Sequence, residues 1–342
     1  MMKRILASLL LLGSISAASA QPQFRFDAAH PDVHDPVMAK GEDGRYYIFA
    51  TGFGVSVLSS ADMKEWRPEP AALKVIPEWA KQEVKGYNGH TWAPDIYHHN
   101  GMWYLYYSCS TFGKNGSAIG LATNKTLDPK SPDFEWKDQG MVIASHRGVD
   151  CWNAIDPSLV VDEKGQPYLF YGSFWDGIQM VKLSKKDLKT PTSKPVTVAR
   201  RFDKKYKLED IVFTQEGHNT IEAGENAIEA PFIYKHGDYY YMFVSFDYCC
   251  RGQNSTYKTV YGRAKKAKGP YYDKEGKRMD KGGGTYLYGP NETYFGVGHS
   301  SAYDFDGSSY FISHAYEKDK NGGAKLFIRP LVFDEEGWIV TE

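Results

Sequence analysis

The sequence has no excess of positive charge and only one long apolar run. Its 41 Lys and Arg residues balance 42 Asp and Glu residues, for a formal net charge of −1. This balance gives no electrostatic basis for binding nucleic acid or an anionic membrane. The apolar run lies at the start of the chain and is shorter than the roughly 20 residues that a membrane-spanning helix needs. We therefore expect no nucleic-acid partner and no membrane insertion.

The first 20 residues have the pattern of an export signal. Lys3 and Arg4 form a short basic start, residues 5–15 are apolar, and Ala18-Ser19-Ala20 offers a small-residue cleavage site. We expect residues 1–20 to be a signal peptide and residues 21–342 to form the mature protein. That protein would be soluble, monomeric and exported, either to the periplasm or out of the cell.

Cysteine is scarce. There are four cysteines, and two of them, Cys249 and Cys250, are adjacent, so they cannot form the usual C-x-x-C zinc chelate. Disulfides persist in exported proteins, and four cysteines allow three complete pairings. Free thiols at Cys109 and Cys151 are the alternative. A bond between Cys249 and Cys250 would close a tight, strained turn, and the pairing stays open.

Helical periodicity is also lacking, apart from one short turn at 77–84. Instead, a strand, a Gly-containing turn and a Tyr- or Phe-rich strand recur five times. The copies begin at Asp35, Ala93, Asp156, Ala230 and Ser300. Each copy has the pattern of a β-hairpin, because a Gly turn lies between two runs of alternating apolar and aromatic residues.

Further strand-like segments follow each hairpin, which gives three or four strands per repeat. A four-stranded unit repeated radially is a β-propeller, so the sequence predicts an all-β, five-bladed propeller. Length alone would favour about two domains at roughly 150 residues each, but the repeats predict one domain over 21–342. The polar stretches 184–197 and 265–284 are expected to be surface loops between strands.

Aligning the repeats on their first strands brings acidic residues together. The aligned positions are Pro36, Pro94, Pro157, Pro231 and Ser301. The first strand of a propeller blade runs nearest the central axis. The residues just before these positions should therefore ring one mouth of the channel, and they include Asp35, Asp156, Glu229 and His299.

Three carboxyl groups at one mouth suit glycoside hydrolysis. That reaction needs a protonated acid at the leaving oxygen and an ionised carboxylate that activates water or attacks carbon. Like charges close together also raise one pKa and keep an acid protonated near neutral pH. Singly, Asp35 and Asp156 would be read as Asp-Pro turn openers. Because they converge with Glu229 at one mouth of the channel, a catalytic role is favoured over the role of turn openers.

The motifs in this order resemble glycoside hydrolase family 43, and most closely its arabinanases, from about His34 to the C-terminus. They are His34-Asp35-Pro36, Trp92-Ala93-Pro94-Asp95, Asn153-Ala154-Ile155-Asp156-Pro157, Glu229-Ala230-Pro231 and Gly298-His299-Ser300, with Ser110-Thr111-Phe112-Gly113 and Tyr248-Cys249-Cys250-Arg251-Gly252. The resemblance implies an inverting hydrolase with Asp35 as general base, Glu229 as general acid, and Asp156 tuning the acid and orienting substrate. It also implies a central, calcium-like ion that His299 contacts and that water otherwise binds.

The same resemblance implies the substrate contacts. Trp92, Phe112 and Trp175 are candidates for stacking on sugar rings, with Asn153 and Ser173 as polar contacts. Asp95 is assigned a structural role.

The leading hypothesis is endo-acting cleavage of α-1,5-linked arabinan. The alternatives are an exo-acting arabinofuranosidase or xylan-directed enzyme on the same scaffold, a retaining sucrase-like propeller, and a non-catalytic sugar-binding propeller.

Overall fold

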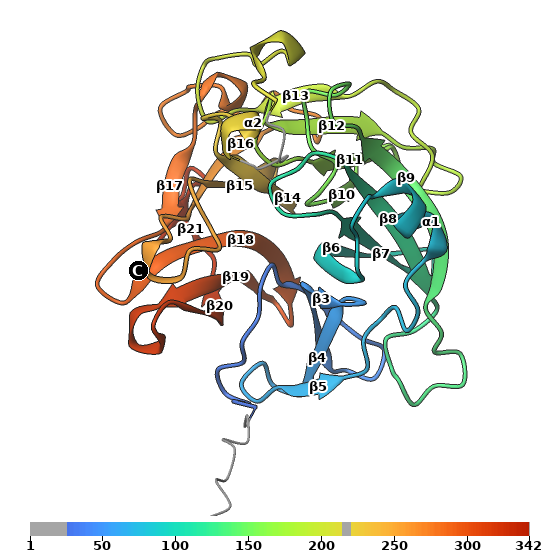
Figure 1. Ribbon diagram of the computed structural model, residues 1–342. Helices are drawn as coiled ribbons and strands as arrows, with labels where there is room; N and C mark the ends of the chain where they lie inside the picture. Colours follow the sequence, from blue (N-terminus) through green and yellow to red (C-terminus); the bar gives the residue numbers. More distant parts are fainter. Residues whose placement is uncertain (1–25, 214–219, 342) are drawn as a thin grey trace, which may run out of the picture.

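The computed structural model describes residues 26–213 and 220–341, so the predicted signal peptide lies outside the described residues. Within them, antiparallel sheets are arranged radially around a central axis as five blades (Figure 1). The all-β, five-bladed propeller predicted from the repeats is confirmed.

The first three blades each have four antiparallel strands. Their bounds are β1 Val37–Lys40, β2 Tyr46–Ala50, β4 Ser56–Ser60 and β5 Arg67–Glu69; β6 His90–His99, β7 Met102–Cys109, β8 Ser117–Asn124 and β9 Lys137–Ser145; and β10 Ser158–Val161, β11 Pro167–Tyr171, β12 Ile178–Lys182 and β13 Val196–Ala199. The short strand β3 (Gly52–Phe53) pairs with β6 and so links the first two blades.

Blades 4 and 5 share one hydrogen-bonded sheet. Their strands are β14 Ile228–His236, β15 Tyr239–Phe246, β16 Lys258–Ala264 and β17 Thr285–Tyr288, then β18 Tyr294–Phe305, β19 Ser308–Glu317 and β20 Gly323–Pro330. The two blades are joined by a single parallel contact between Lys258 and Val297.

The N-terminal segment completes blade 5. Asp32 forms an antiparallel bridge with Lys325 of β20. On either side of it, the Val33 N–H donates to the Ala324 carbonyl at 3.2 Å, and the Leu326 N–H donates to the Pro31 carbonyl at 3.1 Å. The ring therefore closes by pairing the start of the described chain with its last blade.

The core lies between the blades. Five clusters of buried apolar side chains occupy the five junctions between neighbouring blades of the described chain. Strand β2 illustrates how one strand contributes side chains to two of these clusters. Tyr46 and Ile48 pack towards blade 5, whereas Tyr47 and Phe49 pack towards blade 2. Successive side chains of a strand point to opposite faces, so a strand covered on both faces is apolar at every position.

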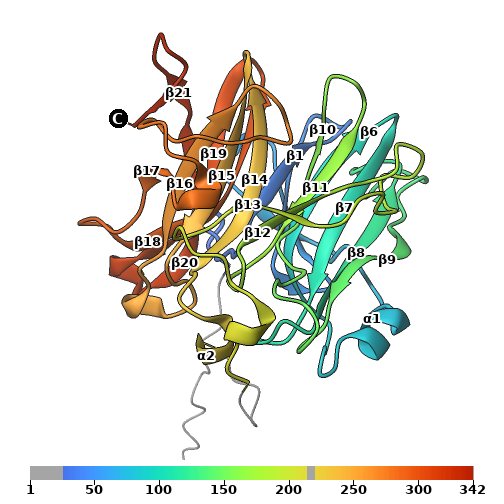
Figure 2. The same ribbon diagram turned by 90° about the horizontal axis from the view of Figure 1, so that it is seen from above.

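Helices are few and short. Helix α1 (Glu78–Glu83) falls in the predicted 77–84 segment, and α2 (Thr220–Ala223) precedes blade 4. Both helices lie on one side of the ring, and the C-terminal hairpin of β21 (Val332–Phe333) and β22 (Ile339–Val340) lies on the other (Figure 2). No helix of the described chain is long and apolar enough to cross a membrane. All four cysteines are free thiols.

Candidate active site

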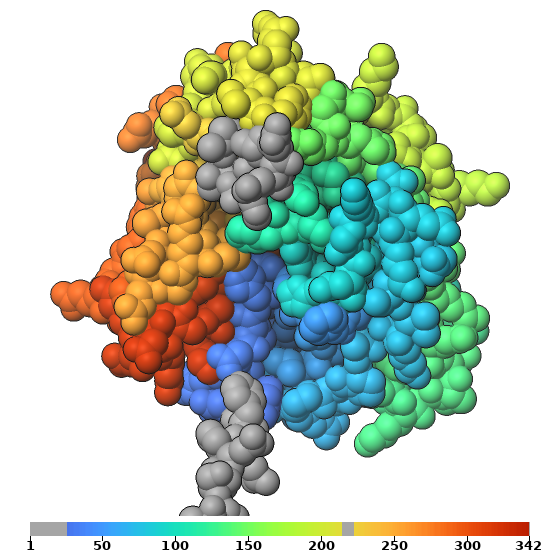
Figure 3. All heavy atoms as spheres, in the orientation of Figure 1, coloured from blue at the N-terminus to red at the C-terminus, as the bar shows by residue number. Residues whose placement is uncertain are grey.

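One cavity of about 1020 Å³ opens at the axis of the ring. In the space-filling view the surface is hollowed near the centre (Figure 3). The structure places all nine predicted site residues in the lining of this cavity. They are Asp35, Trp92, Phe112, Asn153, Asp156, Ser173, Trp175, Glu229 and His299.

The first strand of each blade has the same backbone bend within it or just before it. The bent residue has a positive φ: 55° at Asp35, 39° at Ala93, 58° at Asp156, 56° at Ala230 and 52° at His299. This conformation is uncommon for residues with a side chain and persists where the surrounding structure fixes it. Proline follows the bend in four blades, and Ser300 follows it in the fifth. The alignment that set Ser301 opposite the prolines is therefore wrong by one residue, and His299 is equivalent to Asp35 and Asp156.

A side chain near the end of the second strand of the preceding blade fixes the bend in four of the five blades. It accepts a hydrogen bond from the N–H of the bent residue: Thr51 for Ala93, Ser108 for Asp156, Ser245 for His299 and His314 for Asp35. The fourth blade differs. The Ala230 N–H donates to Oδ2 of Asp156 at 3.1 Å, and the Ser173 hydroxyl donates to Oε2 of Glu229 at 2.7 Å. The polar groups of this junction therefore hold two of the three carboxyl groups.

Asp35 lies between two imidazole rings. Its Oδ1 is 2.8 Å from Nδ1 of His34 and 2.9 Å from Nδ1 of His299, and its Oδ2 accepts a hydrogen bond from the Thr51 hydroxyl. Burial opposes the charge, but the two imidazoles outweigh it and hold the pKa of Asp35 well below its usual range. The carboxylate is ionised, as a general base must be.

Asp156 and Glu229 have the opposite tendency. Burial is the main cause that raises the pKa of each. The charges of Glu229 and Asp35 raise the pKa of Asp156 further. Two neighbouring carboxyl groups do not readily ionise together, so this pair retains a proton at a pH where isolated carboxyl groups have lost theirs. The site thus combines an ionised carboxylate with a carboxyl pair that retains a proton.

His299 is the residue to test for a central ion. Its Nδ1 faces Asp35, and its Nε2 has no hydrogen-bond partner among the described residues. Burial disfavours its charged form, but Asp35, Asp156 and Glu229 together raise the pKa of His299 to about 9. A carboxylate on one ring nitrogen is the usual way to direct the other at a metal. An imidazole binds a metal only through an unprotonated nitrogen, and calcium prefers oxygen ligands, so an ion at the axis would take Nε2 of a neutral His299 as one ligand and water for the rest.

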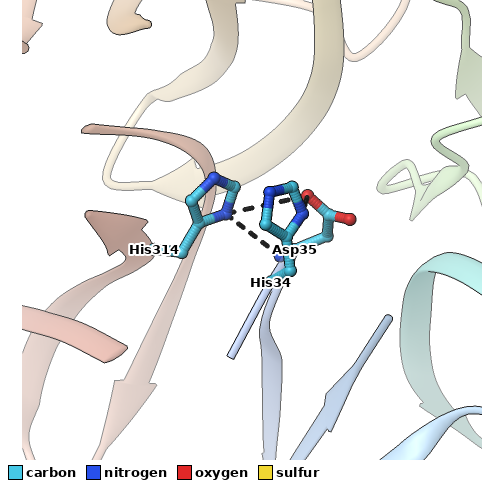
Figure 4. Close-up of side chains that lie close together, drawn as sticks. All are labelled: His34, Asp35 and His314. Atoms are coloured by element: carbon cyan, nitrogen blue, oxygen red, sulfur yellow. Dashed lines mark hydrogen bonds and ion pairs between the residues drawn. The ribbon is translucent and has the colours of Figure 1, made fainter. Parts of the chain in front are cut away.

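A second group of possible metal ligands is formed by His34, Asp35 and His314 (Figure 4). The two imidazole rings stack with centroids 3.9 Å apart. Their nitrogens already have partners: each ring places Nδ1 against Asp35, and each Nε2 contacts the Tyr316 hydroxyl, at 2.7 Å from His34 and 3.2 Å from His314. These side chains are a hydrogen-bonded support for Asp35 rather than an open metal site.

The predicted substrate contacts differ in how available they are. Phe112 is 70% exposed at the rim, whereas Trp175 is 3% exposed and offers little ring surface for stacking. The buried Oδ1 of Asn153 has no hydrogen-bond partner in the described part of the chain. Buried polar atoms nearly always have one, so this atom is suited to a substrate hydroxyl. Ser173 holds Glu229, and Asp95 accepts a hydrogen bond from the Leu159 N–H at 2.7 Å, which is a structural contact.

Sequence reasoning missed the residues that support the carboxyl groups. Thr51, Ser108, Ser245 and His314 occupy one position, near the end of the second strand of a repeat, and Gly172 occupies it in the third repeat. A hydroxyl or imidazole recurs there in four of the five copies, so extending the repeat alignment would have found them. Tyr316, which joins His34, His314 and the Cys250 N–H, follows no such pattern.

Comparison with known proteins agrees with this geometry. Residues 29–339 match the family model of glycosyl hydrolases family 43. The chain is 47% identical to an extracellular exo-α-(1→5)-L-arabinofuranosidase of Cellvibrio japonicus, over 91% of this chain and 86% of the relative. It is 39% identical to an extracellular endo-α-(1→5)-L-arabinanase of Bacillus subtilis, over 94% and 91%. A crystal structure of an exo-1,5-α-L-arabinanase from a bovine ruminal metagenomic library superposes with a TM-score of 0.86 at 57% identity, and the match covers 94% of this chain and all of that one.

Proposed function

Since the chain belongs to glycosyl hydrolases family 43, we propose that it hydrolyses α-1,5-linked L-arabinan with Asp35, Asp156 and Glu229. The observation that carries this proposal is the opposite pKa shifts of carboxyl groups within one cavity. The pKa of Asp35 is lowered, whereas those of Asp156 and Glu229 are raised. Environments that push carboxyl pKa values apart assign the acid and base roles of an enzyme.

The proposed reaction is a single displacement with inversion. Asp35 removes a proton from a water molecule as its oxygen attacks the anomeric carbon, and Glu229 donates its proton to the departing glycosidic oxygen. Water must fit between base and substrate, so the carboxyl groups of Asp35 and Glu229 are expected to lie roughly 6.5 to 9.5 Å apart. Exchange with solvent then returns both groups to their starting states.

The other residues of the site act on these two. The charge of Asp156 disfavours ionisation of Glu229, so it helps to keep the acid protonated. The Ser173 hydroxyl sets the orientation of Glu229 through its hydrogen bond to Oε2. The central ion is part of this proposal: Nε2 of His299 would be its protein ligand, and the ion would supply positive charge at the axis.

The position of cleavage along the chain has two candidates. The sequence motifs favour endo action. Exo action is the second candidate because the two relatives with exo names are more similar to this chain than the relative with an endo name. A cleft that is closed at one end by loops would release short products only from a chain end.

The relatives from Cellvibrio japonicus and Bacillus subtilis are both named as extracellular enzymes. We propose that this protein is likewise exported and acts as a monomer, in the periplasm or outside the cell.

Proton NMR during hydrolysis of linear arabinan tests the proposed function. We expect the first-formed products to have the anomeric configuration opposite to that of the substrate, because water attacks directly. Early products of many lengths indicate endo action, and short products of one length indicate exo action. Glu229→Gln is the control for contaminating enzymes. Products that first appear with the substrate's anomeric configuration would contradict the inverting mechanism. An absence of arabinan cleavage would contradict the proposal that arabinan is the substrate.

A further inference from the structure

A second cavity, of about 630 Å³, lies at the outer part of blade 4. It is formed between the end of β16, the loop that follows it and the C-terminal hairpin. Arg263, Lys265, Lys266, Lys268 and Lys274 are its basic residues, and Asp273 is its single acidic residue. We call this cavity the basic groove.

The charge of the basic groove is only partly balanced by nearby acidic residues. Lys265 pairs with Asp238 at 3.2 Å and Lys274 with Asp334 at 3.6 Å, both at exposed positions where an ion pair stabilises little. Lys266 and Lys268 are exposed and form no ion pair with the described residues. The whole chain has a net charge of −1, so this concentration of positive charge does not follow from the composition.

The one carboxyl group of the groove is already used. Asp273 is buried, and its oxygens accept hydrogen bonds from the N–H groups of Glu275, Lys277 and Gly284. These bonds hold the loop in one conformation. Asp273 therefore shapes the groove and is not free to bind a cation there.

Aromatic side chains make the groove rigid. The Arg263 guanidinium lies 4.1 Å from the ring centroid of Tyr239 and 3.7 Å from that of Trp338. Tyr271, which is 1% exposed, anchors the loop through a hydrogen bond to the Ala267 carbonyl. Tyr272 presents 40% of its surface beside the lysines. A site that is ordered before binding loses less conformational entropy when a ligand arrives.

The basic groove is separate from the catalytic cavity. Tyr239 begins β15 and Arg263 lies near the end of β16, whereas Ser245, near the opposite end of β15, contacts His299 of the catalytic site. The two cavities share no lining residue. A ligand in the groove would leave the catalytic cavity open.

We propose that the basic groove binds a polyuronate, a polysaccharide whose sugar rings carry carboxylates. Arabinan has no charge, so it does not explain five cations in one groove. Repeated carboxylates can each meet an ammonium group, while the exposed face of Tyr272 can pack on a sugar ring. The choice of a glycan over other polyanions rests on the proposed function. An enzyme held on an acidic polysaccharide would act on neutral arabinose chains attached to it.

Nucleic acid fits the groove less well. Single strands are bound by successive aromatic rings on which bases stack, and Tyr272 is the single ring lining the groove with more than a third of its surface exposed. Arginine is the preferred side chain for bidentate phosphate contacts, but the Arg263 guanidinium lies against two rings and donates to the Glu336 carbonyl. The lysines that remain suit spaced carboxylates.

Binding of polygalacturonate by the full-length enzyme tests this proposal. Titration calorimetry at about 50 mM salt should detect binding that is lost near 500 mM, because exposed charges are screened. Lys266→Gln/Lys268→Gln should weaken binding about fivefold or more. The matched control is Lys186→Gln/Lys194→Gln, which removes two exposed lysines of blade 3 that form no ion pair within the described chain. The control should bind as the unaltered enzyme does.

Three results would overturn the proposal: no binding at low salt, equal weakening by both double variants, or equally tight, lysine-dependent binding of DNA or phosphatidylglycerol vesicles. Activity on linear arabinan is measured in parallel and should be unchanged in both double variants. Failure of the unaltered enzyme to cleave arabinan would contradict the proposed function but would leave a positive binding result standing. The two proposals can therefore fail separately.

Discussion

Among single residues, the side chains around each carboxyl group determine its protonation. Asp35 and Asp156 occupy equivalent positions in blades 1 and 3, with the same backbone bend and a following proline. Asp35 contacts two imidazoles and its pKa falls, whereas Asp156 is buried near Glu229 and its pKa rises. The repeat places the two carboxyl groups at equivalent backbone positions, and the neighbouring side chains determine the pKa of each.

Substrates with different leaving groups should separate the base from the acid. Glu229→Gln keeps the size of the side chain and removes its proton. We expect it to slow arabinan hydrolysis by about 10²- to 10⁴-fold, because that leaving group needs a general acid. An activated aryl arabinoside, which leaves without protonation, should retain substantial activity. Asp35→Asn should lose activity on both substrates, since each requires an activated water molecule. Initial rates on the two substrates give the comparison.

Asp156→Asn completes this series. Removing its negative charge should lower the pKa of Glu229, so the pH at which activity is lost through ionisation of the acid should move downward. If Asp35→Asn were rescued by the aryl substrate and Glu229→Gln were not, the two roles would be exchanged. Near-normal activity in all three folded variants would favour the sugar-binding propeller.

The sequence was sufficient to bring the carboxyl groups together, because Asp-Pro and Glu-Ala-Pro mark the blade starts. It did not align the fifth blade correctly. Ser300 stands there in place of proline, and the alignment was displaced by one residue. It also did not predict Tyr316, whose contacts with His34 and His314 depend on side chains from two blades. A repeat pattern locates equivalent backbone positions but does not show what fills the space between them.

Among the elements, the closure of the ring depends on a very short pairing. Hairpins were predictable because each has a Gly-containing turn between apolar runs. The pairing of Asp32 with Lys325 was not, since it joins distant segments through a single bridge with no turn and no alternation. The Nζ atom of Lys325 reinforces this bridge by contacts with Asp32 Oδ1 at 2.8 Å and the His30 carbonyl at 3.1 Å.

Lys325→Met should therefore weaken ring closure. Lys325 is 7% exposed, and methionine keeps its length while removing both contacts. We expect the free energy of unfolding to fall by about 1 to 2 kcal/mol, measured by urea denaturation. Lys320→Met is the control, because Lys320 is exposed and forms no ion pair with the described residues. Equal stability of the two variants would mean that the closing strand depends on its backbone bonds alone.

Across the whole molecule, the ring separates two kinds of surface. The catalytic cavity gathers carboxyl groups at the axis, and the basic groove gathers lysines at the outer part of blade 4. The net charge of −1 conceals both concentrations. The composition gives only the overall charge, whereas the local concentration arises because the fold places the loop at 265–284 against the C-terminal hairpin.

The proposed ion at the axis should stabilise the ring as a whole, because a ligand that binds only the folded state raises its stability by mass action. We expect dialysis against a chelator to lower both activity and the thermal unfolding midpoint, and calcium to restore them. His299→Gln, which removes the single nitrogen available to the ion, should have a midpoint that responds neither to chelator nor to calcium. Metal analysis of the dialysed protein verifies that the ion has been removed. A fully metal-free enzyme with unchanged activity and midpoint would show that His299 serves Asp35 alone.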